Sequence, residues 1–434
     1  MLHIKCGDGV GKTTSAVGQA VRMLGYNKKV IMSYWTICRM KTTKKIYVKV
    51  SIIFLLGGIL LFSSCEKEEN QKIEANRKTL FMYLPWSSNL TNYFYNNISD
   101  LEKCITKIGL NNEKVIVFIS TGSTEAMMFE IVSSHGRCKR EILKKYKSPP
   151  FTTIDGITAI LNDVKAFAPA SVYTMIIGCH GMGWLPVYEM KVRSAPHMKM
   201  HWEYQGVPLT RYFGGLTAEY QTDIKSLASG IANAGMKMEY ILFDDCYMSS
   251  IEVAYELKDV TKYLIGSTSE MMAYGMPYAA IGEYLLGNPD YQSGCEEFYN
   301  FYSTYEIMPC GTLAVTDCSE LENMAAIIKS INSKYSFDKS LRGTIQRLDG
   351  YTPVIFYDFA DYITSLCNDP ILLNQFREQL NHLVPYKTHT KNFYTMAKGI
   401  IPINTFSGIT TSDPSDNPMT VLKENTLWYK AAHN

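Results

Sequence analysis

The sequence predicts an α/β protein in which a mostly parallel central sheet is flanked by helices. Short, nearly continuous apolar runs occur at 114–120, 173–178 and 240–243. Stretches with helical periodicity separate them, at 155–167 and 221–234. Strands buried on both faces need apolar residues throughout, not alternating polar and apolar positions. The pattern therefore favours parallel strands with helices packed on each side.

The same alternation orders the region from residue 79 to 290. Strands are expected at 79–84, 114–120, 173–178, 240–243 and 263–267, and helices near 90–108, 155–167, 221–234 and 249–257. The segment 291–434 has helical stretches near 321–335 and 370–382 and short apolar runs at Leu313 and Ile400. This pattern predicts a C-terminal α/β extension, residues 291–434, that packs on the preceding domain.

Composition is that of an ordinary globular protein and argues against a nucleic-acid partner. Of the 434 residues, 46% are hydrophobic, and 43 basic against 41 acidic side chains give a formal net charge of +2. At that balance no strong overall field attracts polyanions. The 11 cysteines include no CxxC pair and no zinc-finger spacing, so we expect no structural metal and assign no disulfide.

Residues 40–65 have the layout of a bacterial lipoprotein signal peptide. A lysine-rich start precedes an apolar stretch at 50–62, which is shorter than the roughly 20 residues that span a bilayer as a helix. The segment LFSSC at 61–65 resembles a lipobox, so Cys65 is the expected lipidation site and residues 66–78 form a tether. Glu66, in place of Asp, favours the outer membrane or cell surface of a Gram-negative bacterium. A buried helix or a signal anchor fits the flanking charges less well.

The first 39 residues contain a phosphate-binding motif without the fold that such a motif needs. Residues 7–14, GDGVGKTT, look like a loop that cradles a phosphate and opens a helix. This segment resembles the start of a corrinoid adenosyltransferase, a family that tolerates Cys6 in place of the first glycine. A P-loop must sit in a parallel sheet, and 39 residues cannot bury a core to hold one. We therefore interpret residues 1–39 as a spurious fragment.

Two predicted strands end in residues of complementary chemistry. One runs into His180 and Gly181, the other into Cys246. Functional residues gather at the carboxyl ends of parallel strands, where an imidazole can take the thiol proton and leave a nucleophilic thiolate. The Gly181 N–H could complete an oxyanion hole with the Cys246 amide, and a helix start at 249–252 would favour the thiolate. Alone, either residue is more often an ordinary loop or core residue.

The residues around this pair resemble the clostripain family of cysteine peptidases, which shares a caspase-like fold with legumains and gingipains. The resemblance extends from about residue 79 to the C-terminus, and its main segments are HGMGW at 180–184, DDCYM at 244–248, IEVAYEL at 251–257, YLIGSTSEMMAYGMP at 263–277 and FYDFA at 356–360. Two positions depart from the family pattern. Met182 stands where a small residue is more common, and Asp245 where Ala is usual.

The resemblance implies a cysteine endopeptidase that cleaves after Arg or Lys. His180 would be the general base and Cys246 the nucleophile that forms a thioester. Asp244 matches the position of the family's carboxylate for a basic P1 side chain, and Glu270 is a second candidate for this S1 pocket. The added carboxylate of Asp245 would either deepen the preference for basic substrates or raise the pKa of the thiol.

The segment between the two strand ends contains candidate sites for self-processing, because some relatives mature by cutting themselves there. The candidates are Lys191, Arg193, Lys199 and Arg211. The alternatives are a plain surface insertion or a metal site through His197 and His201, whose spacing suits one face of a helix. Pro196 and the lack of a third ligand argue against the metal.

These observations leave different classes of function to compare. The first is a membrane-anchored endopeptidase, a monomer that acts on peptide or protein substrates with basic P1 residues and requires no cofactor, with calcium as the candidate ion. The second is a lipoprotein that keeps the peptidase fold but binds peptides without cutting them. A third, more distant one is an ATP-dependent adenosyltransferase built on the N-terminal loop. Selective alkylation of Cys246 discriminates the first two.

Overall fold

The computed structural model describes residues 76–87, 90–179, 181–187, 207 and 220–433. All of them fall in the unit that spans Ile73–Asn434. The expected P-loop fragment at 1–39, the signal peptide at 40–65 and the tether up to residue 75 lie outside the described residues. The tether was expected to run to residue 78, but a strand already begins at Asn76.

The described part of the chain is built on a nine-stranded sheet with the order β10-β8-β7-β6-β5-β1-β2-β3-β4. Its centre is parallel, as predicted: β1 pairs with β2 and β5, β5 with β6, and β6 with β7. These strands are β1 (Asn76–Leu84), β2 (Glu113–Ser120), β5 (Ala170–Ile177), β6 (Met238–Phe243) and β7 (Thr261–Gly266). Residues 115–120 of β2 are all buried, as both faces of a central strand require.

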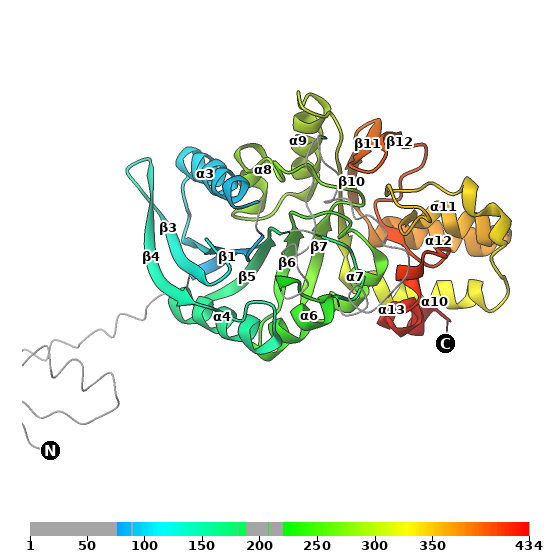
Figure 1. Ribbon diagram of the computed structural model, residues 1–434, viewed down its shortest axis with the longest axis horizontal. Helices are drawn as coiled ribbons and strands as arrows, with labels where there is room; N and C mark the ends of the chain where they lie inside the picture. Colours follow the sequence, from blue (N-terminus) through cyan, green and yellow to red (C-terminus); the bar gives the residue numbers. More distant parts are fainter. Residues whose placement is uncertain (1–75, 88–89, 180, 188–206, 208–219, 434) are drawn as a thin grey trace, which may run out of the picture. The chain divides into compact units, whose positions relative to one another are not determined.

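Helices cover both faces of this sheet, so the predicted flanked α/β architecture is confirmed (Figure 1). One layer contains α3 (Thr91–Ile108), α8 (Tyr278–Leu285) and α9 (Tyr291–Ser303), and the other α4 (Ile154–Phe167), α6 (Ile224–Asn233) and α7 (Ile251–Leu257). Two helix starts are fixed by hydroxyl caps. Thr153 accepts from the Gly156 N–H at 3.1 Å, and Ser250 from the Val253 N–H at 3.5 Å.

One edge of the sheet is a hairpin that the sequence analysis did not anticipate. Strands β3 (Glu125–Ser134) and β4 (Arg137–Lys147) pair antiparallel and continue the sheet beyond β2. The turn between them places His135 at φ 50° and Gly136 at φ 68°, the two positive angles of a type I′ hairpin turn. Strand β4 is largely exposed and rich in Lys and Arg, which discourages pairing of an edge strand with another chain.

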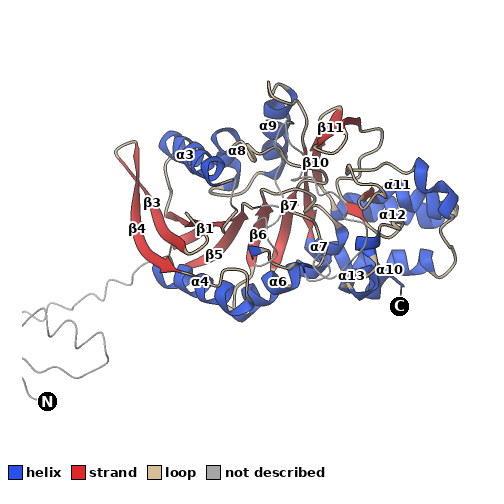
Figure 2. Cartoon of the chain, in the orientation of Figure 1, coloured by secondary structure: helices blue, strands red, loops and turns tan. Residues whose placement is uncertain are grey.

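The residues after 291 extend the other edge of the same sheet. Strand β8 (Thr312–Asp317) pairs antiparallel with β7, and β10 (Tyr386–His389) pairs antiparallel with β8. The remaining elements lie beside this edge, as Figure 2 shows. They are η3 (Cys318–Glu320), α10 (Leu321–Asn332), η4 (Lys339–Thr344), β9 (Tyr357–Asp358), α11 (Phe359–Leu366), α12 (Pro370–Leu383), β11 (Asn392–Thr395), β12 (Gly399–Pro402), β13 (Thr410–Thr411), η5 (Pro418–Thr420), η6 (Lys423–Asn425) and α13 (Leu427–His433).

Two pairs of short strands complete the C-terminal part of the chain, residues 291–433. Strand β11 pairs with β12, and β13 with β9, both antiparallel. The apolar runs expected at Leu313 and Ile400 are thus β8 and β12. Within the described ranges, no helix is both long and apolar enough to cross a membrane.

Candidate active site

The candidate site lies where β5, β6 and β7 end. These strands are parallel, so their carboxyl ends share one edge of the sheet. Ile177, the last residue of β5, is the register partner of Phe243, the last residue of β6, and the Asp244 N–H donates to the Ile177 carbonyl at 2.8 Å. The segments that follow the two strands therefore start side by side.

Gly181 and Cys246 are in direct backbone contact beyond these strand ends. A Cβ placed on Gly181 would lie 2.1 Å from the Cys246 carbonyl oxygen and 3.0 Å from its amide nitrogen. Only a glycine permits this approach. His180 itself lies outside the described residues, but its chain neighbour Gly181 touches the residue that the sequence analysis paired with it.

The other neighbour of His180 is bound to the same segment. The Cys179 N–H donates to Asp245 Oδ1 at 2.6 Å, and the Cys179 thiol donates to Asp245 Oδ2 at 3.4 Å. Asp245 has no exposed surface. This carboxylate was expected to act on the substrate or on the thiol of Cys246, and in the structure both of its oxygens accept hydrogen bonds from Cys179.

The Cys246 thiol is buried and accepts a hydrogen bond from a backbone N–H. The residue has no exposed surface. The Met271 N–H donates to its sulfur at 3.1 Å, and the sulfur lies 3.7 Å from the Met271 carbonyl oxygen. An N–H directed at sulfur stabilises a negative charge on it. The predicted helix, α7, begins five residues after Cys246 and is 7 residues long.

Tyr247 turns the chain sharply after the thiol. Its φ is 62°, a left-handed value that costs a non-glycine residue energy and is common at functional sites. Its N–H donates to the Ser269 carbonyl at 3.0 Å, and its ring stacks on Phe356 with centroids 4.9 Å apart. Burial, with the Glu270 charge adding to it, raises the pKa of Tyr247 well above its usual value, so the hydroxyl stays a donor.

The two carboxylates proposed for the S1 pocket are both buried and both accept hydrogen bonds. Asp244 accepts from the Met276 N–H at 2.8 Å and from the Tyr278 hydroxyl at 2.9 Å. Glu270 accepts from the Tyr247 hydroxyl at 2.8 Å and from the Met396 N–H at 3.0 Å. Asp244 follows β6 and Glu270 follows β7, so both belong to the edge that carries Cys246.

Residues from the C-terminal part, which the sequence analysis did not single out, support the segment after Gly181. Trp184 Nε1 donates to Ser412 Oγ at 2.9 Å, and the Ser412 N–H donates to Glu252 in α7 at 2.7 Å. The Tyr351 hydroxyl donates to the sulfur of Met182 at 3.3 Å. No local sequence signal could have revealed these contacts, because the partners are separated by up to 228 residues.

Several predicted site residues lie outside the described residues. They are Cys65, Lys191, Arg193, Lys199 and Arg211, together with the alternative metal ligands His197 and His201. Among the residues that are described, no three His, Cys, Asp or Glu side chains gather as a metal ion would require.

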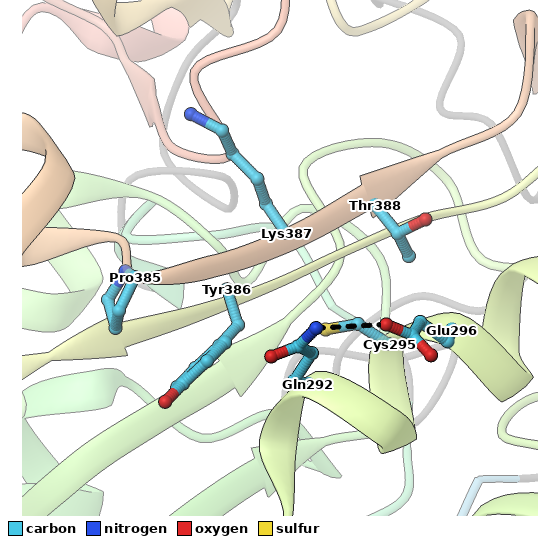
Figure 3. Close-up of a pocket in the computed structure, with 7 residues that line it drawn as sticks. All are labelled: Gln292, Cys295, Glu296, Pro385, Tyr386, Lys387 and Thr388. Carbon is cyan, nitrogen blue, oxygen red and sulfur yellow. Dashed lines mark hydrogen bonds between the residues drawn. The ribbon is translucent and has the colours of Figure 1, made fainter.

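A hollow of about 400 Å³ lies elsewhere, between α9 and β10. Figure 3 shows the residues that line it: Gln292, Cys295, Glu296, Pro385, Tyr386, Lys387 and Thr388. A hydrogen bond of 3.1 Å joins Gln292 to Glu296 across one side. None of these residues belongs to the segments directly after β5, β6 and β7 that form the candidate site, so the hollow is separate from it.

Two family models match the chain. The clostripain family matches residues 82–413. The ATP:corrinoid adenosyltransferase family matches residues 1–83, further than the 39 residues expected, and the end of this match overlaps β1 of the sheet. No curated protein matches the chain.

Solved structures of bacterial cysteine proteases resemble the chain over most of its length. A secreted cysteine protease from Bacteroides thetaiotaomicron, iotapain, is 58% identical, with 83% of this chain and 99% of that one covered and a TM-score of 0.77. A clostripain from the same species, in complex with a peptide inhibitor, is 65% identical over 51% of this chain and 99% of its own, with a TM-score of 0.51. An inactive zymogen protease from Parabacteroides distasonis shares the fold at 24% identity, covering 82% and 98% of the two chains with a TM-score of 0.68. Together with the strand-end geometry, these matches show that the chain belongs to the clostripain family of cysteine peptidases.

Proposed function

We propose that this protein is an endopeptidase that hydrolyses peptide bonds after Arg or Lys, with His180 and Cys246 as its catalytic pair. The contact between Gly181 and the Cys246 backbone carries the proposal. It brings the chain on the C-terminal side of His180 against the nucleophile, and the bond from Cys179 to Asp245 does the same on the other side. These two contacts support His180, the residue between Cys179 and Gly181, as the base that takes the thiol proton.

The reaction follows from these positions. His180 takes the thiol proton, and the Cys246 sulfur attacks the peptide carbonyl to form an S–C bond. The imidazolium returns the proton to the leaving amine as the C–N bond breaks, and a thioester remains. Water, deprotonated by His180, then hydrolyses the thioester and the thiol is regenerated. The Gly181 N–H is the proposed oxyanion donor, together with the Cys246 amide.

We assign the preference for a basic P1 side chain to Asp244, with Glu270 second. A buried carboxylate at the site favours a cationic side chain over a neutral one. The inhibitor in the complex of the 65% identical clostripain has the peptide sequence VLTK, in which the residue next to the reactive AOMK group is lysine. That relative's ligand supports a basic P1 residue here.

Peptide hydrolysis tests the catalytic and pocket assignments together. Fluorogenic peptides with Arg, Lys, Asn or Asp at P1 are offered to the purified protein and to Cys246→Ala, His180→Ala and Asp244→Asn. We expect cleavage after Arg and Lys only. Cys246→Ala and His180→Ala should lose this activity, and Asp244→Asn should raise the KM for basic peptides. Cleavage that survives in Cys246→Ala would refute the nucleophile. Equal cleavage after Asn would refute the pocket.

Access to the thiol provides the reason to propose self-processing. Cys246 has no exposed surface, so part of the protein must move before a peptide can reach it. We propose cleavage after Lys191, Arg193, Lys199 or Arg211 as that step. Mass spectrometry of the purified protein and of Cys246→Ala tests this. An intact chain with full activity would refute it.

We propose that the protein is exported and anchored through a lipid on Cys65, as a monomer at the outer membrane or cell surface. The description of iotapain as secreted supports export. Labelling with a palmitate analogue, which Cys65→Ser should abolish, tests the anchor, and size-exclusion chromatography of the detergent-solubilised protein tests the monomer. We further propose that residues 1–39 play no part in activity. Deletion of them, and an ATP-binding assay, test this.

We propose that hydrolysis requires no cofactor. The reaction above needs only a thiol, a base and water, so EDTA should leave the rate unchanged. Loss of activity in EDTA that calcium restores would show instead that the ion is needed.

A further inference from the structure

Asp245 is a buried carboxylate located between the two segments that flank the catalytic pair. It has no exposed surface, and it accepts the Cys179 N–H at 2.6 Å and the Cys179 thiol at 3.4 Å. Cys179 comes 66 residues earlier in the chain. A separation of 2.6 Å is at the short end of the range for N–H···O hydrogen bonds. Asp245 therefore joins the two strand ends through a short hydrogen bond.

The same side chain also touches the residue on the other side of His180. Its Cβ would lie 2.9 Å from a Cβ on Gly181. Asp245 thus contacts both chain neighbours of His180 and is itself the residue before Cys246.

The geometry points to Asp245 as a positioning residue, which holds Cys179 and Gly181, the two chain neighbours of His180, against the Cys246 segment and thereby positions the base. This inference rests on the proposed function. In this role Asp245 acts on neither the substrate nor the reacting atoms. It acts through the Cys179 backbone, because the bond to the N–H fixes the main chain of the residue directly before His180.

An alternative is that the negative charge of Asp245 acts through space on the thiol or the imidazole. The two possibilities differ in what an amide would do. Asparagine keeps an oxygen that accepts from the Cys179 N–H but removes the charge. Alanine removes both.

The experiment compares Asp245→Asn and Asp245→Ala in the whole protein, by hydrolysis of a Lys peptide across pH. A misplacement of about 1 Å can cost about 100-fold in rate. We therefore expect Asp245→Ala to lose roughly 10- to 100-fold in kcat, with KM within about 3-fold of the parent. Asp245→Asn should keep kcat within about 3-fold, with an unchanged pH profile.

A matched control comes from Asp358. It is equally buried and accepts the Ser407 N–H at 2.6 Å, but it lies at the start of α11 and not at the strand ends. Asp358→Asn should lower the melting temperature while leaving kcat per folded molecule unchanged. If Asp245→Ala does not fold, Asp245→Ser replaces it, because its hydroxyl is one bond too short to reach the same N–H.

Each outcome separates this inference from the proposed function. A parent protein that cleaves no basic peptide refutes the proposed function, whatever the variants do. An active parent whose Asp245→Ala and Asp245→Ser variants keep full kcat refutes the positioning role alone. Asp245→Asn as slow as Asp245→Ala, or with a shifted pH profile, shows that the charge acts instead.

Discussion

Replacing Gly181 by Ala is the sharpest test of the contact between the strand ends. The added Cβ would meet the Cys246 carbonyl oxygen at 2.1 Å, whereas ordinary contact begins near 3.4 Å. The two backbones would have to separate by about 1.3 Å. Because a misplacement of about 1 Å between reacting groups can cost about 100-fold, we expect kcat to fall by roughly that factor. The clash is local, so the fold should persist.

The assay measures kcat and KM on a Lys peptide, and circular dichroism and thermal melting report the fold. Gly122→Ala is the control, because nothing lies within 4 Å of the added Cβ and the φ of that glycine is ordinary. The control should retain full activity. A Gly181→Ala enzyme that is folded and within a few-fold of the parent would refute the reasoning, since the segment that carries His180 could then move without cost.

Three further predictions concern stability. Burial raises the pKa of Glu252 to about 7, so the folded state holds a proton that the unfolded state releases near 4.5. Stability should fall as pH rises from about 4.5 to about 7, by an amount of order 3 kcal/mol, and Glu252→Gln should lack this component in melting curves across that range. Thr153→Ala removes the cap of α4 and should cost about 1 kcal/mol in denaturant unfolding without changing kcat. Trp184→Phe leaves the buried Ser412 hydroxyl without its donor and should cost about 1–3 kcal/mol in the same assay; no change would show that the bond is dispensable.

The parallel centre of the sheet was predictable because burial on both faces leaves a direct trace in composition. Strands β2, β5, β6 and β7 are short apolar runs, and each coincides with an expected strand. The β3–β4 hairpin was missed because β4 is largely exposed and rich in charged residues, so it lacks the continuous apolar run that marks the buried strands. Its turn, His135-Gly136, lacks the Asn-Gly or Asp-Gly pair that usually marks such hairpins.

Some features of the site were likewise predictable from the sequence and others were not. The meeting of the Gly181 and Cys246 segments followed from a rule about parallel strands, which needs only the order of elements. The donor to the Cys246 sulfur did not follow, because it is the main chain of Met271 and any residue could supply it. The orientation of Asp245 was equally unreadable. A carboxylate in a sequence carries a charge, but only the fold decides which donor it faces.

The C-terminal part contributes to the site through the loop after β7. Thr312, at the start of β8, lies 2.8–3.1 Å from Ser267, Thr268 and Ser269, all through its one hydroxyl oxygen. These residues immediately precede Glu270 and Met271, the second S1 candidate and the donor to the thiol. A strand from beyond residue 291 thus fixes the loop that reaches Cys246. It follows that residues 79–290 alone lack part of what holds this site together, although they include both members of the proposed catalytic pair.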